Sequence, residues 1–155
     1  MRVLGVAVVL LCVLIGVVYF SASYQLGREA KRLFDKGNYK DAHAIAMKAL
    51  EEDPYNRSAF GIANQAKQRL NIQTFLQNAK ENQEIAFKIL KDGSLSPEEF
   101  LRLGWMVEEF QRNYRTLFIF NQPNPNEKEQ LEQYSQWFEN LNQRLKEVKQ
   151  SQNAR

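Results

Sequence analysis

Residues 23–56, SYQLGREAKRLFDKGNYKDAHAIAMKALEEDPYN, contain two helix-forming stretches separated by one sharp break. Gly37-Asn38 provides the turn between them, and Pro54 stops the second stretch and starts the next helix. Small residues, which let helix backbones approach closely, recur where the two helices would cross: Ala30, Ala42, Ala46 and Ala49. The segment therefore predicts an αα-hairpin.

The spacing of seven residues in this hairpin resembles a tetratricopeptide repeat, a helical unit of about 34 residues. The seven are Ala30, Leu33, Gly37, Tyr39, Ala42, Ala49 and Pro54. Glu29 departs from the family pattern, because it stands where the family usually has an apolar residue. The resemblance implies close packing through the alanines, an elbow filled by Tyr39 and a following helix whose entry angle is set by Pro54.

One such repeat is evident in the chain. Residues 57–70 fit the first helix of a further repeat, with an apolar face made of Phe60, Ala63, Ala66 and Leu70. Family members that grip a peptide's C-terminal carboxylate use Lys, Arg and Asn side chains over several repeats, whereas the comparable places here hold Gly27, Lys31, Gly61 and Gln65. We therefore expect the hairpin to assemble with other helices rather than to clamp a peptide.

Upstream of the hairpin, the run from Val3 to Phe20 contains no charged residue. As a helix it would be roughly 27 Å long, which is close to the thickness of a bilayer's hydrocarbon core. The run predicts that residues 1–22 form a transmembrane anchor that contacts lipid through residues 3–20. Two alternatives are a buried core helix and a cleaved signal peptide, although the run is longer than the usual signal-peptide core.

The net charge of +3 is too small and too scattered to indicate nucleic-acid binding. Around the predicted anchor, Arg2 stands on one side and Arg28, Lys31 and Arg32 stand on the other, which slightly favours a cytoplasmic C-terminal domain. The short Met-Arg start is instead typical of bacterial signal anchors. We predict a single-pass protein of the bacterial inner membrane with an exported C-terminal domain. The single cysteine, Cys12, excludes an intrachain disulfide.

Downstream of the hairpin, residues 71–150 predict a helical bundle, followed by a disordered tail at 151–155. A first amphipathic helix ends at Asp92-Gly93-Ser94, and its apolar residues are Ile72, Phe75, Leu76, Ala79, Ile85, Ala86, Phe87, Ile89 and Leu90. The next helix starts at Ser96 as cap and Pro97 as first residue, with acidic residues in its first turn.

Two apolar seams of equal length follow, each with alternating steps of three and four residues. The first contains Phe100, Leu103, Val107, Phe110, Tyr114 and Leu117, and the second contains Leu131, Tyr134, Phe138, Leu141, Leu145 and Val148. A short loop at 121–126 with two prolines joins them. The seams predict an antiparallel helical hairpin within one chain, and pairing in trans between two chains is the alternative.

Several large residues lie off these seams, among them Leu101. Five are candidate partner-binding residues: Trp105, Met106, Phe118, Phe120 and Trp137. They either complete the core between the C-terminal hairpin and the earlier helices or form an exposed apolar patch where a protein partner docks.

Sequence motifs that would indicate a metal site or a catalytic site are incomplete. Asp92–Phe100 resembles the second half of an EF-hand calcium loop, but Lys88 and Leu90 stand where oxygen ligands would be required. His43 is the only histidine, and neither a zinc-binding nor a nucleophile–base spacing accompanies it. We therefore predict no catalytic residues, no metal, no cofactor and no small-molecule substrate, and we do not expect an enzyme.

The sequence as a whole predicts an all-α fold with an N-terminal transmembrane helix, a tetratricopeptide-like hairpin and a C-terminal antiparallel helical hairpin. The predicted function is a membrane-anchored protein–protein interaction scaffold within a larger membrane complex, whose partners are themselves membrane proteins. One alternative is an accessory subunit or assembly factor of a respiratory, photosynthetic, secretion or motility machine. A second alternative is a self-associating coiled-coil membrane protein.

Overall fold

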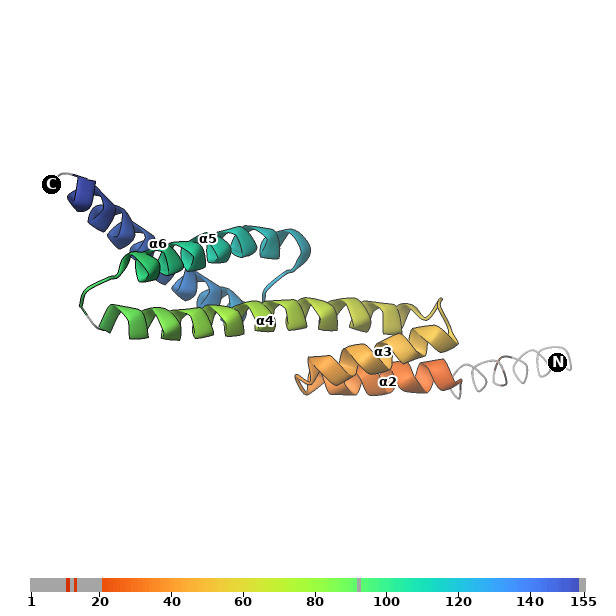
Figure 1. Cartoon of the computed structure of the whole chain (residues 1–155). Coiled ribbons are helices and arrows are strands. Elements are labelled where there is room, and N and C mark those ends of the chain that lie inside the picture. Colours follow the sequence, from red (N-terminus) through yellow and green to blue (C-terminus); the bar gives the residue numbers. More distant parts are fainter. Residues whose placement is uncertain (1–10, 12, 14–20, 92, 154–155) are drawn as a thin grey trace, which may run out of the picture. The chain divides into compact units, whose positions relative to one another are not determined.

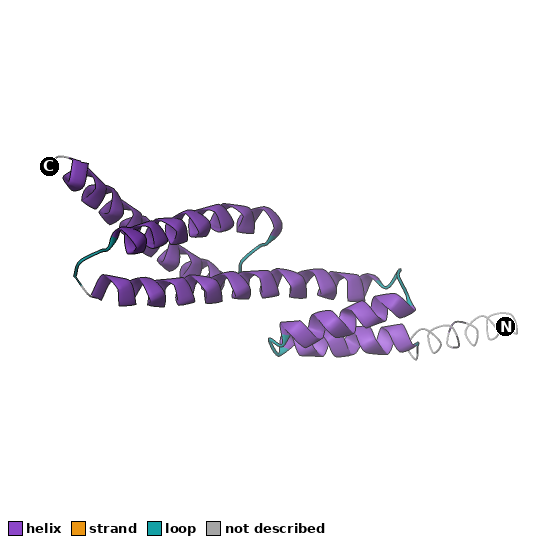
Figure 2. Ribbon diagram, in the orientation of Figure 1, coloured by secondary structure: helices purple, strands orange, loops and turns teal. Residues whose placement is uncertain are grey.

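The computed structural model describes residues 11, 13, 21–91 and 93–153. Within these residues the chain is helical and contains no strand, which confirms the prediction of an all-α protein (Figure 1). Figure 2 shows that short loops connect the helices. The helices are α2 (Ala22–Asp35), α3 (Tyr39–Glu52), α4 (Arg57–Lys91), α5 (Pro97–Phe120) and α6 (Pro125–Asn153).

The predicted fold class requires a correction, because its N-terminal transmembrane helix is not supported. Among the residues that the structure describes, no helix combines the length and the apolar character needed to cross a bilayer. The helices that are long enough, α4 to α6, carry charged side chains along their whole length. The predicted anchor at residues 3–20 lies almost entirely outside the described residues.

The chain divides into two compact units, unit 1 (residues 1–70) and unit 2 (residues 71–155). The boundary falls inside α4, which continues without a break from one unit into the next. The sequence has no Gly or Pro close to this boundary, so nothing there interrupts the hydrogen-bonded backbone of the helix. Residues 57–70 and 71–91, which the sequence assigned to separate helices, therefore form one helix.

In unit 1, α2 and α3 form the predicted hairpin. Ala30, Ala42 and Ala49 are completely buried, and Leu33 is half-buried. The core cluster joins Ala30 with Ala46 and with two residues of α4, Ile62 and Ala63. Small side chains therefore form most of the contact surface, so that the helices approach closely and each buried residue removes little apolar area from water.

The turn of the hairpin depends on Gly37, whose φ of +78° is unfavourable for residues with a Cβ. Asn38 then caps α3, because its side chain accepts a hydrogen bond from the backbone N–H of Asp41. Tyr39 packs against Phe34 with 5.1 Å between the ring centroids. Pro54 is exposed in the loop between α3 and α4.

Hydrogen bonds tie together the end of the hairpin opposite this turn. The buried Ser23 hydroxyl donates to the carbonyl oxygen of Ala49 at 2.8 Å. The Asn56 side-chain amide donates to the hydroxyl of Ser23 at 2.8 Å and to its carbonyl at 3.2 Å. The Asn56 amide oxygen accepts the backbone N–H of Ala59 at 3.1 Å, which caps the first turn of α4. Ser23 and Asn56 thus connect α2, α3 and α4.

The face predicted for residues 57–70 is partly wrong. Phe60 is 59 % exposed, whereas Ala59 and Ile62 are buried beside Ala63 and Ala66. The helical repeat places Phe60 about 100° around the helix from Ala59, so both cannot face the same neighbour. The α4 face that contacts the hairpin is the one with alanines, because only small side chains fit the close approach.

In unit 2, α5 and α6 run antiparallel, and residues 71–91 of α4 pack against them as a third helix (Figure 1). The centre is an aromatic stack: Phe110 of α5 lies 4.1 Å from Phe138 of α6, and Phe75 of α4 lies 5.2 Å from Phe110. The two predicted seams face inward in the same chain and supply most of the buried residues, including Leu103, Val107, Leu117, Leu131, Leu141 and Leu145.

The start of α5 confirms the predicted cap. The Ser96 hydroxyl accepts the backbone N–H of Glu99, and the Glu99 carboxylate accepts the backbone N–H of Ser96 at 2.9 Å. This is the reciprocal arrangement of a capping box. Farther along the chain, α6 continues to Asn153, so residues 151–153 are helical although they were predicted as part of a disordered tail.

Candidate functional site

The outward side of α5 is the candidate functional site. Trp105, Ile119 and Leu101 are 68 %, 69 % and 56 % exposed, although all three are large apolar residues. With 3.6 residues per turn they fall on one line along the helix, together with three exposed charged residues. We define the outer face of α5 as Leu101, Trp105, Glu108, Arg112, Arg115 and Ile119.

The packing of unit 2 orients this face. The opposite side of α5 carries Leu103, Phe110 and Leu117, which are buried against α4 and α6. An ordinary amphipathic helix would carry polar residues along the side that remains. The outer face of α5 departs from that pattern at both of its ends, where it is apolar, and follows it only in the middle.

The structure does not bring the five predicted partner-binding residues together on one surface. Trp105 is exposed, but its neighbour Met106 is buried in the core with Ile89 of α4, because consecutive helical residues point about 100° apart. Trp137 is half-buried, with its ring 5.3 Å from Phe87.

The remaining two candidates lie at the end of α5. Phe118 is 41 % exposed and packs edge-on against Tyr114, with 5.0 Å between the centroids. Phe120 is the last residue of α5, and its side chain lies outside the described part of the structure. Ile119 was missed by sequence reasoning, although its spacing from Leu101 and Trp105 placed it on the same helical face.

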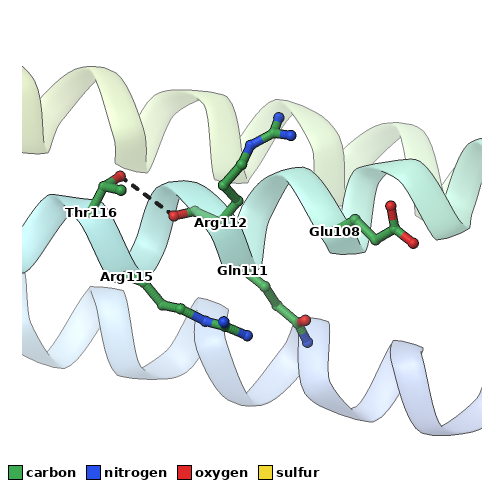
Figure 3. Close-up of a pocket in the computed structure, with 5 residues that line it drawn as sticks. All are labelled: Glu108, Gln111, Arg112, Arg115 and Thr116. Carbon is green, nitrogen blue, oxygen red and sulfur yellow. Dashed lines mark hydrogen bonds between the residues drawn. The ribbon is translucent and has the colours of Figure 1, made fainter.

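The middle of the outer face is polar. A shallow, open depression of about 460 Å³ lies there, lined by Glu108, Gln111, Arg112, Arg115 and Thr116 (Figure 3). Figure 3 shows Arg112 extending from one edge of α5 and Arg115 and Gln111 from the other. The Thr116 hydroxyl donates to the carbonyl oxygen of Asn113 at 3.0 Å. Because all lining residues come from one helix, the depression has no opposite wall to enclose a small ligand.

The charged groups of this face are available to a partner. Within the part of the chain that the structure describes, Glu108, Arg112 and Arg115 form no ion pair with one another or with other residues. In the α5 cap, hydrogen bonds from the Ser96 backbone and hydroxyl lower the pKa of the Glu99 carboxyl. No group of three or more potential metal-ligating side chains occurs among the described residues.

Comparison of the chain with known protein families, with characterised proteins and with solved structures finds no match. The resemblance of residues 23–56 to a tetratricopeptide repeat therefore stays a prediction from the residues quoted above.

Proposed function

We propose that this chain is a non-catalytic helical scaffold that binds protein through the outer face of α5. The observation that carries the proposal is the exposure of Trp105, at 68 %, on the side of α5 that faces away from the core. Tryptophan is one of the residues most enriched among those that dominate protein–protein binding energy. An exposed tryptophan aligned with two further large apolar residues is typical of a docking surface.

The free energy that these three apolar side chains could contribute to association is consistent with a binding role. Full burial of a large apolar side chain contributes roughly 1.5–3 kcal/mol. Association costs an estimated 4–15 kcal/mol in lost translational and rotational freedom. Three apolar residues alone would therefore give weak binding, and the charged middle of the face is needed to add specificity and orientation.

Two other strongly exposed aromatic residues of the described chain lie away from α5. Tyr55, which is 90 % exposed, lies in the loop between α3 and α4, and Phe60 lies on α4 in unit 1. Tyr55 stands between Pro54 and Asn56, and the residues one turn away from Phe60 along α4 include the polar Arg57 and Asn64. Single exposed apolar residues of this kind are common and require no partner.

Site-specific photo-crosslinking in cells tests this proposal. A photoreactive amino acid at position 105 of the full chain should give a crosslinked protein adduct of defined mass. The same probe at Gln136, an exposed position on α6, is the matched control and should give none. Absence of an adduct at position 105, or equal labelling at both positions, would contradict binding through this face.

A substitution pair gives an independent check. Trp105→Ser should abolish most of the adduct formed by a probe placed at Leu101, because it removes the largest apolar contact of the face. Phe60→Ser makes a similar change at an exposed aromatic residue of unit 1 and should leave the adduct unchanged. Circular dichroism should show the same helix content for both variants.

A further inference from the structure

The side chains on the outer face of α5 form complementary pairs about the middle of the face. Phe110 lies at its centre on the buried side of the helix. Leu101 and Ile119 are equally far from Phe110 along the helix, and so are Glu108 and Arg112. Trp105 and Arg115 form a third such pair. Each pair combines side chains that attract one another: two apolar residues, an acid with a base, and an aromatic ring with a cation.

We propose that the partner of this face is a second copy of the same chain, bound with the two α5 helices antiparallel. The proposal rests on the proposed function and names its partner. A two-fold axis beside Phe110 would place Leu101 of each copy against Ile119 of the other. Such an interface is isologous, because the same patch on both copies is complementary to itself.

The charged residues of the outer face of α5 favour a second copy of the chain as the partner. In the antiparallel pair, Glu108 of one copy faces Arg112 and Arg115 of the other, and the exposed Glu109 on the adjacent flank also reaches this region. Two acidic and two basic groups from each copy are then neutralised. A purely apolar partner would instead leave both guanidinium groups at the interface without counter-charges, which weakens binding.

Trp105 and the neighbouring Gly104 also fit antiparallel pairing of the two α5 helices. Arg115 of the second copy would lie near Trp105, where a guanidinium group can stack on the indole face. Gly104 precedes Trp105 on α5, and a Cβ atom placed on it would have no heavy atom within 4 Å. The open space at Gly104 accommodates the aliphatic stem of that arginine.

Parallel pairing is excluded by the same residues. In a parallel pair each residue meets its own equivalent, so that Glu108 would face Glu108 and Arg112 would face Arg112. Like charges directly opposed destabilise an interface. The arrangement therefore specifies orientation as well as partner.

The expected dimer is weak. The outer face is about 27 Å long and one helix wide. It buries less than the roughly 1,600 Å² of a standard stable interface. We therefore expect dissociation in the micromolar range and weakening at high salt, because exposed charges are screened.

Charge reversal in the full chain tests the pairing by sedimentation equilibrium. The variant Glu108→Arg with Glu109→Arg makes the face entirely basic, and Arg112→Glu with Arg115→Glu makes it entirely acidic. Each variant alone should dimerise about tenfold or more weakly than the unmodified chain, because like charges then oppose each other. An equimolar mixture of the two should form mixed dimers at least as tightly as the unmodified chain.

The mixture keeps the test independent of folding, since a misfolded variant could not recover binding with its counterpart. Reversal of two exposed acidic residues of α6, Glu139→Arg with Glu147→Arg, is the matched control and should leave dimerisation unchanged. Unchanged dimerisation of both outer-face variants, or failure of the mixture to dimerise, would overturn the proposal.

Cysteine crosslinking tests the orientation. In a Cys12→Ser background, which removes the only native cysteine, chains with Leu101→Cys are mixed with chains with Ile119→Cys. Antiparallel pairing should give a disulfide only in the mixture, because equivalent positions lie about 27 Å apart. Disulfides within either variant alone, or none in the mixture, would overturn antiparallel pairing.

The two proposals fail in different ways. A monomeric chain whose position 105 still crosslinks to a different protein would overturn self-association and leave the proposed function standing. A monomeric chain with no adduct at position 105 would overturn both.

Discussion

The two units of this chain are stabilised by cores of opposite character. In the described part of unit 1 the buried apolar residues are seven alanines and one isoleucine: Ala30, Ala42, Ala46, Ala49, Ala59, Ala63, Ala66 and Ile62. In unit 2 the largest completely buried side chains are Phe138, Ile72, Leu103 and Leu131. Helices that meet through alanines can approach closely but bury little apolar area, whereas helices that meet through large side chains bury much more.

This difference shows where each unit obtains its stability. Unit 2 depends on apolar burial and aromatic stacking around Phe110 and Phe138. Unit 1 supplements a thin core with the buried side-chain hydrogen bonds of Ser23 and Asn56. We therefore expect unit 2 to respond most to loss of volume, and unit 1 to respond most to added volume and to loss of hydrogen bonds.

The largest effect is expected for Phe138→Ala. Phe138 is completely buried and stacks on Phe110 at 4.1 Å, so its truncation should destabilise unit 2 by about 3–5 kcal/mol. Both tryptophans of the chain lie in unit 2, so urea unfolding followed by tryptophan fluorescence reports on this unit. Phe118→Ala is the control, and it should cost much less because Phe118 is 41 % exposed. Equal losses would show that burial does not set the stability of unit 2.

The next effect tests close packing in unit 1. Ala46→Leu adds volume at a completely buried contact of α3 and should destabilise the hairpin by about 1–3 kcal/mol. Ala44→Leu makes the same change at an exposed position of the same helix and should be nearly neutral. Amide hydrogen exchange of α2 and α3 measures both. Tolerance of leucine at position 46 would mean that the helices do not require small residues there.

Asn56→Ala tests the hydrogen bonds that supplement this core. It removes the α4 cap and both contacts to Ser23, and it should cost about 1–2 kcal/mol. A double-mutant cycle with Ser23→Ala should show coupling, because the two side chains bond each other directly. Asn64→Ala, at an exposed position of the same helix, is the control. Additive losses from Asn56→Ala and Ser23→Ala would contradict a shared network.

The smallest effect concerns the α5 cap in unit 2. Hydrogen bonds from Ser96 lower the pKa of Glu99, so this carboxylate stabilises the fold above the pKa of an unperturbed glutamate. As pH falls from that value through the lowered folded-state value, the stabilisation should be lost. Glu99→Gln should remove this pH dependence, whereas Glu98→Gln removes the same charge outside the capping box and should retain it. Thermal unfolding between neutral and acidic pH measures the difference.

Several parts of the fold were predictable because they depend on local chemistry. The cap at Ser96 and Pro97 was predictable because the first backbone N–H groups of a helix need hydrogen-bond acceptors. The turn at Gly37 was predictable because glycine readily adopts the positive φ that this turn requires. The seam residues of α5 and α6 are inward because their spacing matches the helical repeat. The predicted anchor followed from composition alone, and no helix of the described residues supports it.

The candidate site was only partly predictable. Trp105 was identified, but Met106 and Trp137 were grouped with it because sequence distance from a seam does not report exposure. Exposure depends on which helices surround α5, and the sequence left open whether the earlier helices pack against the C-terminal hairpin. The additional neighbour, residues 71–91 of α4, is the reason that Met106 lies in the core.

The sequence by itself determined the turn before α3, the cap of α5 and which side of each C-terminal helix is apolar, because caps, turns and helical periodicity act within a few residues. Only the tertiary structure decided that α4 continues through both units and that Trp105, Leu101 and Ile119 remain on the outside. These features depend on contacts between residues far apart in the chain, and such contacts leave no local pattern in the sequence.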